Sequence, residues 1–205
     1  SMIRVLPQNL DLRTAALAEP LGVAIHAINV GGSIAGKNIL VSGSGPIGLL
    51  IIAAAKIMGA AYVTATDVAS PALVRAASVG ATQIIQIGEN EVPHDSFDIV
   101  FECSAAPAAV SSALQSVRRA GVIVQVGTLG QGAQSIEIAP IVSKEVEFRG
   151  SFRFIDEIVN AIEMLEANSW IASIITHEYL AADAVEAFTL AKNPELSGKV
   201  LIKFS

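Results

Sequence analysis

A glycine-rich segment, Gly43-Ser44-Gly45-Pro46-Ile47-Gly48, matches the pattern G-x-G-x-x-G, whose backbone N–H groups can bind a pyrophosphate. The first glycine would permit a tight turn, the second would let the backbone approach the ligand, and the third would let a helix pack closely on a sheet. We therefore predict that Gly43, Gly45, Ile47 and Gly48 hold a pyrophosphate. The alternative is that these glycines only shape a turn between a strand and a helix.

An acidic residue follows this segment at the spacing of a dinucleotide site. Asp67 comes nineteen residues after Gly48, where its carboxylate can accept hydrogen bonds from both hydroxyls of an adenosine ribose. The alternative is a solvated residue before a turn. Residues 68–74 contain no cation, and Arg75 comes eight positions after Asp67. A 2′-phosphate would therefore meet the carboxylate without a compensating charge, so we expect NAD to bind in preference to NADP.

A second glycine-containing turn is the candidate for the other end of such a cofactor. Val126, Gly127 and Thr128 stand at the end of another apolar run. Their backbone groups could hold a nicotinamide carboxamide at the edge where open parallel sheets bind ligands. A glycine-rich turn leaving a strand is the alternative interpretation.

These residues lie at the ends of β-rich and helical segments that alternate along the chain. Such alternation is typical of parallel strands connected by crossover helices, and it predicts a Rossmann-type doubly wound α/β fold. The expected strands cover residues 37–42, 61–66, 83–87, 97–102 and 122–126, with shorter β candidates at 136–138 and 146–149. The expected helices cover residues 47–58, 70–79 and 107–118.

The two ends of the chain have a different pattern, so we divide the sequence into residues 1–30, 31–170 and 171–205. In the first part, apolar residues from Leu17 to Ile28 fall on one face of a helix. Towards the C-terminus we expect helices at 155–167 and 182–192 and strands at 174–180 and 200–204. His26 is interpreted as a packing residue and Cys103 as a free thiol.

The composition excludes several classes of function. The 205 residues are 52% hydrophobic, which is ample for a core, and the net charge of −6 provides no basic surface for nucleic acid or anionic lipid. The longest uncharged stretch, 38–55, is interrupted by residues 42–46, so no membrane span is expected. One cysteine suits a reducing compartment, and we expect a cytoplasmic location. Ser1-Met2 looks like a remnant of a cleaved tag, which suggests a piece of a longer chain.

Several motifs in order carry a resemblance to one family. They are Ala18-Glu19-Pro20-Leu21-Gly22-Val23-Ala24-Ile25-His26-Ala27, the glycine segment, Thr66-Asp67 and Gly150-Ser151-Phe152-Arg153-Phe154. With these, residues 4–204 resemble the zinc-dependent medium-chain dehydrogenases. The polyol branch, the group of L-idonate and sorbitol dehydrogenases, is the most similar.

The resemblance implies the NAD-binding domain of an enzyme that oxidises a polyol or sugar acid. The zinc ligands would belong to a GroES-like catalytic domain that this sequence does not contain, and the terminal segments would border that domain. The resemblance implies that Glu19 ligates or adjoins the zinc, with a helix-capping acid as the alternative. It places Arg153 near cofactor and substrate, and Ser151 and Phe152 beside the nicotinamide.

The resemblance also implies zinc only in the full-length enzyme, a small-molecule substrate and a homo-oligomer. Two departures from the family pattern are Phe154, where sorbitol dehydrogenases commonly have tyrosine, and Ala72, where a basic residue is common. A non-catalytic dinucleotide-sensing module is one alternative function. An S-adenosylmethionine methyltransferase is another, although the tight G-x-G-x-x-G spacing argues against it.

Overall fold

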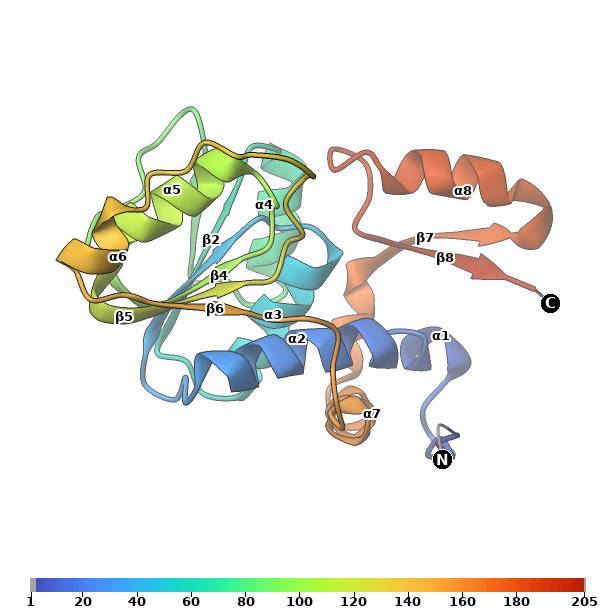
Figure 1. Ribbon diagram of the computed structural model, residues 1–205. Coiled ribbons are helices and arrows are strands. Elements are labelled where there is room, and N and C mark those ends of the chain that lie inside the picture. Colours follow the sequence, from blue (N-terminus) through green and yellow to red (C-terminus); the bar gives the residue numbers. More distant parts are fainter. Residues whose placement is uncertain (1–2, 205) are drawn as a thin grey trace.

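A six-stranded parallel sheet in the order β3-β2-β1-β4-β5-β6 forms the centre of the computed structural model, which describes residues 3–204 (Figure 1). Ser1 and Met2, the expected tag remnant, lie outside the described residues. The strand order reverses between β1 and β4, so the predicted doubly wound, Rossmann-type fold is confirmed. The strands are β1 (Asn38–Ser42), β2 (Tyr62–Asp67), β3 (Gln83–Gln86), β4 (Phe97–Glu102), β5 (Val117–Gln125) and β6 (Glu147–Gly150).

Helices cover both faces of this sheet because alternate side chains of each strand point to opposite sides. In β1, Ile39 and Val41 belong to one apolar core and Leu40 to another. The first core includes residues of α2 (Ala18–Gly31), α3 (Pro46–Ile57), α4 (Ser70–Ser78) and α7 (Ile158–Ala167). The second includes residues of α5 (Pro107–Ser116), and the short α6 (Ala139–Ser143) packs beside it. Within residues 3–204, no helix has the length and apolar character to cross a bilayer.

Three predicted elements differ clearly from the observed ones. Residues 136–138, expected to be β, are irregular and lead into α6, whose first turn contains Pro140. The predicted helix 107–118 ends at Ser116, and β5 begins at Val117 instead of residue 122. The register between β4 and β5 shifts beyond the Phe97–Val117 pair, and Ala120 adopts φ +51°. Apolar periodicity alone does not reveal such an irregular strand entry.

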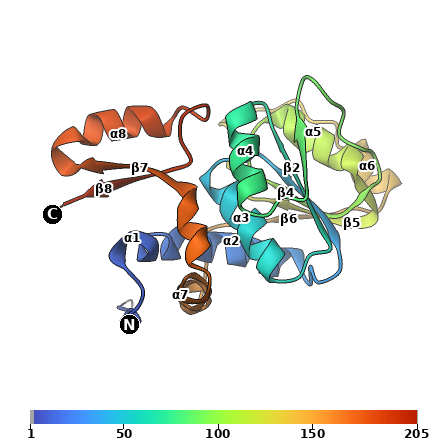
Figure 2. The same cartoon turned by 180° about the vertical axis from the view of Figure 1, so that it is seen from behind.

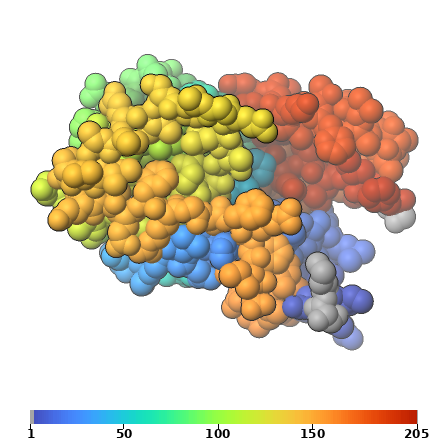
Figure 3. All heavy atoms as spheres, viewed as in Figure 1, coloured from blue at the N-terminus to red at the C-terminus, as the bar shows by residue number. Residues whose placement is uncertain are grey.

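The C-terminal residues form a small unit beside the main sheet (Figures 2 and 3). Its two strands pair in parallel, and the helix between them in sequence packs against both. In both ribbon views this unit lies on the same side of the molecule as α1 (Leu12–Ala15). Its elements are β7 (Ile175–Leu180), α8 (Ala184–Ala191) and β8 (Lys199–Lys203), preceded by the 3₁₀ helix η1 (Ser169–Ile174) and with η2 (Ala181–Asp183) between β7 and α8.

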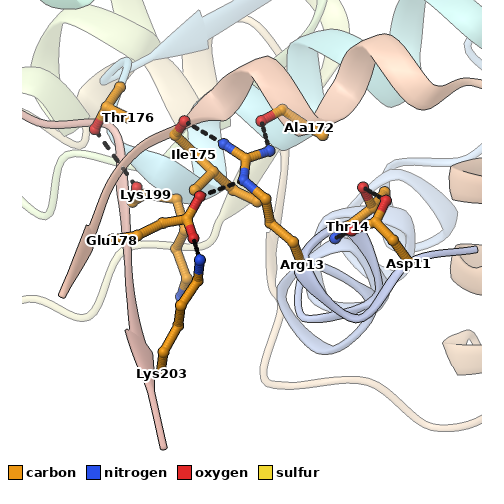
Figure 4. A network of polar contacts seen from close by, with 9 residues as sticks. All are labelled: Asp11, Arg13, Thr14, Ala172, Ile175, Thr176, Glu178, Lys199 and Lys203. Atoms are coloured by element: carbon orange, nitrogen blue, oxygen red, sulfur yellow. Dashed lines mark hydrogen bonds and ion pairs between the residues drawn. The ribbon is translucent and has the colours of Figure 1, made fainter. Parts of the chain in front are cut away.

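Polar contacts join the N-terminal segment to this C-terminal unit (Figure 4). The Arg13 guanidinium donates to the carboxylate of Glu178 in β7 and to the Ile175 carbonyl at 3.2 Å. Lys203 of β8 forms an ion pair with the same carboxylate. These two cations lower the pKa of Glu178, with Lys203 contributing most. One anion thus connects both strands of the small sheet to α1.

Candidate functional site

The residues predicted to bind a cofactor lie along one edge of the main sheet. The strands are parallel, so their C-terminal ends meet at that edge. The glycine segment follows β1, Asp67 ends β2, Val126 follows β5 and Ser151 follows β6. The edge also contains the reversal of strand order, which is where open α/β sheets bind ligands.

The glycine segment is built around two positions that have no room for a side chain. Gly43 has φ +95°, and a Cβ there would lie 2.8 Å from the backbone nitrogen of Ser104. A Cβ on Gly48 would lie 2.0 Å from the Gly43 carbonyl oxygen. At Gly45, by contrast, a Cβ would have no protein atom within 4 Å. Steric exclusion by the protein therefore explains Gly43 and Gly48, whereas the space at Gly45 is open to a ligand.

The N-terminus of α3 faces this space with unpaired backbone donors. Gly45 is the N-cap, no side chain caps the helix, and Pro46 occupies its first turn. The N–H groups of a first helical turn lack intrahelical partners and carry the positive end of the helix dipole. Such a terminus is a site for an anion such as a phosphate.

Asp67 lies directly beside the glycine segment. One of its carboxylate oxygens accepts from the backbone N–H of Ser44 at 2.7 Å, and the other accepts from Ala69 at 2.9 Å. Each oxygen of an ionised carboxylate can accept a further hydrogen bond, so the group can still bind hydroxyls. The structure thus brings together the acid and the loop that the sequence associates by spacing alone.

Arg75 modifies the expectation that no charge offsets Asp67. Burial lowers the pKa of Arg75, while the Asp67 and Glu195 carboxylates act in the opposite direction. The guanidinium therefore interacts electrostatically with Asp67, although it also donates to the Pro194 carbonyl. No hydrogen bond or ion pair joins the two side chains among the described residues, so the expectation that no charge fully offsets Asp67 stays a prediction.

The turn after β5 packs tightly against the turn after β4. The backbone N–H groups of Val126 and Gly127 both donate to the Glu102 carbonyl, at 2.9 and 2.8 Å. A Cβ on Gly127 would lie 2.6 Å from the backbone nitrogen of Ala105, so only glycine fits there. Thr128 is exposed at the end of this turn.

Two buried polar atoms near this turn have no hydrogen-bond partner among the described residues. They are Oε1 of Gln125, at the end of β5, and Oγ of Ser151, just after β6. The two strands are in register here, since the Ser151 N–H donates to the Gln125 carbonyl at 2.9 Å. Buried polar groups are normally paired, so two such atoms on neighbouring strands mark this part of the sheet edge as a candidate for polar contacts to a ligand.

A buried carboxylate beneath the site was not anticipated from the sequence. Glu102 is fully buried and accepts from Ser104, from the Ala105 N–H at 3.3 Å and from the Gln125 amide. This network fixes the turn against which both Gly43 and Gly127 pack. The sequence does contain one indication of this network: an acidic residue at the end of a buried strand needs hydrogen-bond donors around its carboxylate.

Cys103 is a free cysteine, as expected. Burial raises the pKa of its thiol, and the neighbouring Glu102 carboxylate raises it further. The thiol is therefore protonated at neutral pH and is a poor nucleophile.

The segment that the resemblance associates with nicotinamide is exposed at its centre. Phe152 is 77% exposed, and the Arg153 guanidinium lies 5.2 Å from the centre of its ring. Arg153 is also exposed and has φ +56°. Backbone conformations of this kind are uncommon outside glycine and concentrate at functional sites.

The helix that precedes the main sheet carries the remaining predicted residues. Glu19 is exposed in the first turn of α2, where its charge also favours the helix dipole, so both interpretations of this residue stand. His26 is more than a packing residue, because its Nδ1 lies 2.8 Å from Oε1 of the buried Glu157. Among residues 3–204, no cluster of three or more His, Cys, Asp or Glu side chains could hold a metal ion.

Solved structures of dehydrogenases share this fold. The crystal structure of L-idonate 5-dehydrogenase from Escherichia coli K-12 superposes with a TM-score of 0.89 at 34% identity, covering 97% of this chain and 59% of that one. The structure of 2R,3R-butanediol dehydrogenase from Bacillus subtilis superposes with a TM-score of 0.86 at 26% identity, covering 98% of this chain and 60% of that one.

Sequence relatives belong to the same group. The chain is 34% identical to L-idonate 5-dehydrogenase (NAD(P)(+)) of Escherichia coli K12 over 97% of its own length and 59% of the relative. It is 35% identical to sorbitol dehydrogenase of Macaca fascicularis over 97% of its own length and 58% of the relative. The chain thus spans about three fifths of the length of these relatives.

A family model described as "Zinc-binding dehydrogenase" matches residues 46–167, more than half of the chain. The match begins in the first turn of α3, beside the glycine segment, and ends with α7. The predicted resemblance is confirmed: the chain belongs to the zinc-binding dehydrogenase family.

Proposed function

We propose that this chain forms the NAD-binding part of a zinc-dependent dehydrogenase that oxidises a polyol or a sugar acid, as in L-idonate 5-dehydrogenase. One observation carries the proposal. The open space at Gly45, the uncapped N-terminus of α3 and the Asp67 carboxylate converge at the reversal of strand order. This arrangement suits a ligand with both a pyrophosphate and a ribose.

The adenosine half of NAD is assigned to the first βαβ unit. The backbone of Gly43, Gly45, Ile47 and Gly48 would surround the pyrophosphate, with N–H groups of the first turn of α3 donating to its oxygens. Asp67 would accept from the ribose hydroxyls while its bonds to Ser44 and Ala69 keep it oriented.

The nicotinamide half is assigned to the turns after β5 and β6. Polar groups of the carboxamide would use Val126, Gly127 and Thr128 together with the unpaired Oγ of Ser151. The exposed Phe152 and Arg153 would border the nicotinamide and the substrate. Glu19 of α2 would face the substrate side, at or near the zinc.

When bound, NAD accepts a hydride from the alcohol carbon, and zinc eases loss of the alcohol proton. The described residues offer no metal cluster, so we assign the zinc ligands to the catalytic domain that the resemblance implies. The contribution of this chain is to hold and orient the cofactor beside the substrate.

Isothermal titration of the 205-residue chain with NAD, ADP-ribose and S-adenosylmethionine tests the proposal. NAD and ADP-ribose should bind at one site, and Asp67→Ala should weaken both. An Asp98→Asn variant, which alters a carboxylate at the opposite edge of the sheet, should change neither affinity. Binding of S-adenosylmethionine instead of NAD would reject the proposal in favour of a methyltransferase.

A second experiment concerns catalysis by the chain alone. We expect no stoichiometric zinc by elemental analysis and no NADH formation from sorbitol or L-idonate. Zinc-dependent turnover would show that the active site is misplaced. NAD binding without turnover, even after addition of the catalytic domain of a relative, would favour the dinucleotide-sensing alternative.

We further propose a homo-oligomer in a cytoplasmic compartment. β6 is an edge strand of the main sheet, and Phe148 on it is 41% exposed. An exposed edge strand can pair with its copy across a two-fold axis. Light scattering at increasing protein concentration tests this, and a monomer at every concentration would count against it.

A further inference from the structure

One face of α2 carries four residues, and three of them contact the segment after β6 or the Glu157 side chain that follows it. Glu19, Gly22, His26 and Asn29 are spaced by three, four and three positions, which places them on one side of a helix. Gly22 packs under the Phe154 ring, since a Cβ there would lie 3.4 Å from Phe154 Cγ. In the following turns, the side chains of His26 and Asn29 share one partner, the carboxylate of Glu157.

Glu157 is a buried carboxylate whose two oxygens are used differently. Oε1 lies 2.8 Å from Nδ1 of His26 and accepts from the Asn29 amide at 3.2 Å. Oε2 accepts from the backbone N–H groups of Ile155 and Asp156, at 2.8 and 3.0 Å. One oxygen therefore binds the side chains of α2, and the other binds the backbone of the segment.

The electrostatics of Glu157 agree with this geometry. Burial alone would raise its pKa, but the hydrogen bonds from His26, from the backbone and from Asn29 outweigh burial and hold the pKa at about 2. The carboxylate is thus ionised at neutral pH and strengthens each of these hydrogen bonds.

The other end of the segment is also attached. Arg149 donates to the Val30 carbonyl at the end of α2, at 2.6 Å, and Ser151 is held by Gln125 of β5. The exposed Phe152 and Arg153 lie between Ser151, which is held at one end, and Ile155, whose N–H donates to Glu157 at the other end. Both side chains are exposed and lie against each other, so we take their placement to depend on the attachments.

We infer that Glu157 is a positioning residue that fixes the Ser151–Phe154 segment against the face of α2 that carries Glu19. It acts through His26 and Asn29 and contacts neither cofactor nor substrate. The inference rests on the proposed function, because the segment matters to binding only if it borders the nicotinamide. No glycine or aspartate of the adenosine half takes part.

The test compares two ligands that differ in the nicotinamide. ADP-ribose reaches the glycine segment and Asp67, whereas NADH also reaches the segment after β6. In calorimetric titrations, Glu157→Gln should weaken the binding of NADH by about tenfold, because the amide nitrogen of the new side chain would face hydrogen-bond donors. ADP-ribose affinity should stay within about twofold. His26→Ala, which removes one donor, should give a smaller loss in the same direction.

Two measurements separate positioning from a general loss of structure. Amide hydrogen exchange in the ligand-free chain should accelerate at residues 151–156 in Glu157→Gln and remain unchanged in the glycine segment. Asp98→Asn, whose carboxylate also bonds a backbone N–H and a cation, is the matched control and should leave the NADH to ADP-ribose ratio unchanged.

The outcomes distinguish the inference from the proposed function. Equal weakening of both ligands, unchanged affinity for both, or unchanged exchange at residues 151–156 would overturn the positioning role while leaving NAD binding intact. Failure of the unmodified chain to bind either ligand would overturn the proposed function and the inference with it.

Discussion

The adenosine half and the nicotinamide half of the proposed site are built in different ways. The adenosine half consists of backbone held close to backbone, with Gly48 against Gly43 and Asp67 bonded to Ser44. The nicotinamide half consists of exposed side chains on a segment attached at its ends, with the Ser151 hydroxyl lacking a partner among the described residues. Contacts within the protein hold the backbone and the carboxylate of the adenosine half. The nicotinamide half, by contrast, contains a buried hydroxyl that has no such contact among the described residues.

This difference indicates how the two halves respond to change. In the adenosine half, geometry is fixed by steric contact, so substitutions should either abolish folding or affect the ligand alone. In the nicotinamide half, the inferred attachment consists of hydrogen bonds to the Glu157 carboxylate, so it should depend on the protonation of that group and on its partners.

The largest effect is expected from a pair of glycine substitutions that sharpens the contrast. Gly48→Ala should lower the free energy of unfolding by about 3 kcal/mol or more, because its Cβ would overlap the Gly43 carbonyl oxygen. Gly45→Ala should change it by less than about 1 kcal/mol, since Gly45 has φ −72° and open space around it. Gly45→Ala should nevertheless weaken the binding of NAD by at least about tenfold.

Urea denaturation and NAD titration of both variants give the measurement. Equal destabilisation by the two substitutions, or unchanged NAD affinity in Gly45→Ala, would show that the open space at Gly45 is not where the pyrophosphate lies.

The second prediction concerns acid and the nicotinamide half. The folded state lowers the pKa of Glu157 from 4.5 to about 2, so its contribution to stability is complete above pH 4.5 and is lost as the pH falls towards 2. This loss should amount to roughly 2 to 3 kcal/mol. Chemical denaturation across this range measures it.

Because other carboxylates also titrate here, the relevant quantity is the difference between the unmodified chain and Glu157→Gln. That difference should shrink steadily as the pH falls from 4.5. A difference independent of pH would contradict an ionised, hydrogen-bonded Glu157 carboxylate and remove the contrast between the halves.

The third prediction tests Asp67. Asp67→Ala should weaken the binding of NAD roughly tenfold, because hydrogen bonds to the ribose hydroxyls are lost. The same variant should weaken the binding of NADP much less. The unmodified chain should prefer NAD over NADP. Competitive titration with both cofactors is the measurement, and equal affinity of the unmodified chain for both would mean that the carboxylate does not contact the ribose.

The smallest effect is expected at Arg75. Its charge partly offsets that of Asp67, so Arg75→Met should increase the preference for NAD over NADP by about two- to fivefold. Arg118→Met, which removes the cation paired with Asp98, serves as the control. A preference that does not change would show that Arg75 serves only to hold the Pro194 carbonyl.

Much of the fold was predictable because its signals are local. Buried parallel strands such as Asn38–Ser42 contain apolar runs without polar alternation, here Ile39, Leu40 and Val41, and proline marks the first turn of α3, α4 and α5. The glycine segment and Asp67 were identified by spacing, and the fold then places them together. The entry to β5 was mispredicted because its irregular start depends on pairing with β4, which the sequence does not display.

The side-chain networks were less accessible for a related reason. His26 and Glu157 are 131 positions apart, and either alone is consistent with a surface residue or a packing residue. Only the packing of α7 against α2 brings them together.

The turn held by Glu102 has a consequence for how substitutions combine. Gly43 contacts Ser104 and Gly127 contacts Ala105, so the two glycines press on neighbouring residues of one short loop. A methyl group at either position would displace that loop, and the space available at the other would change as a result. Substitutions at 43 and 127 should therefore be non-additive, and sequence drift at one position should constrain which residues the other can accept.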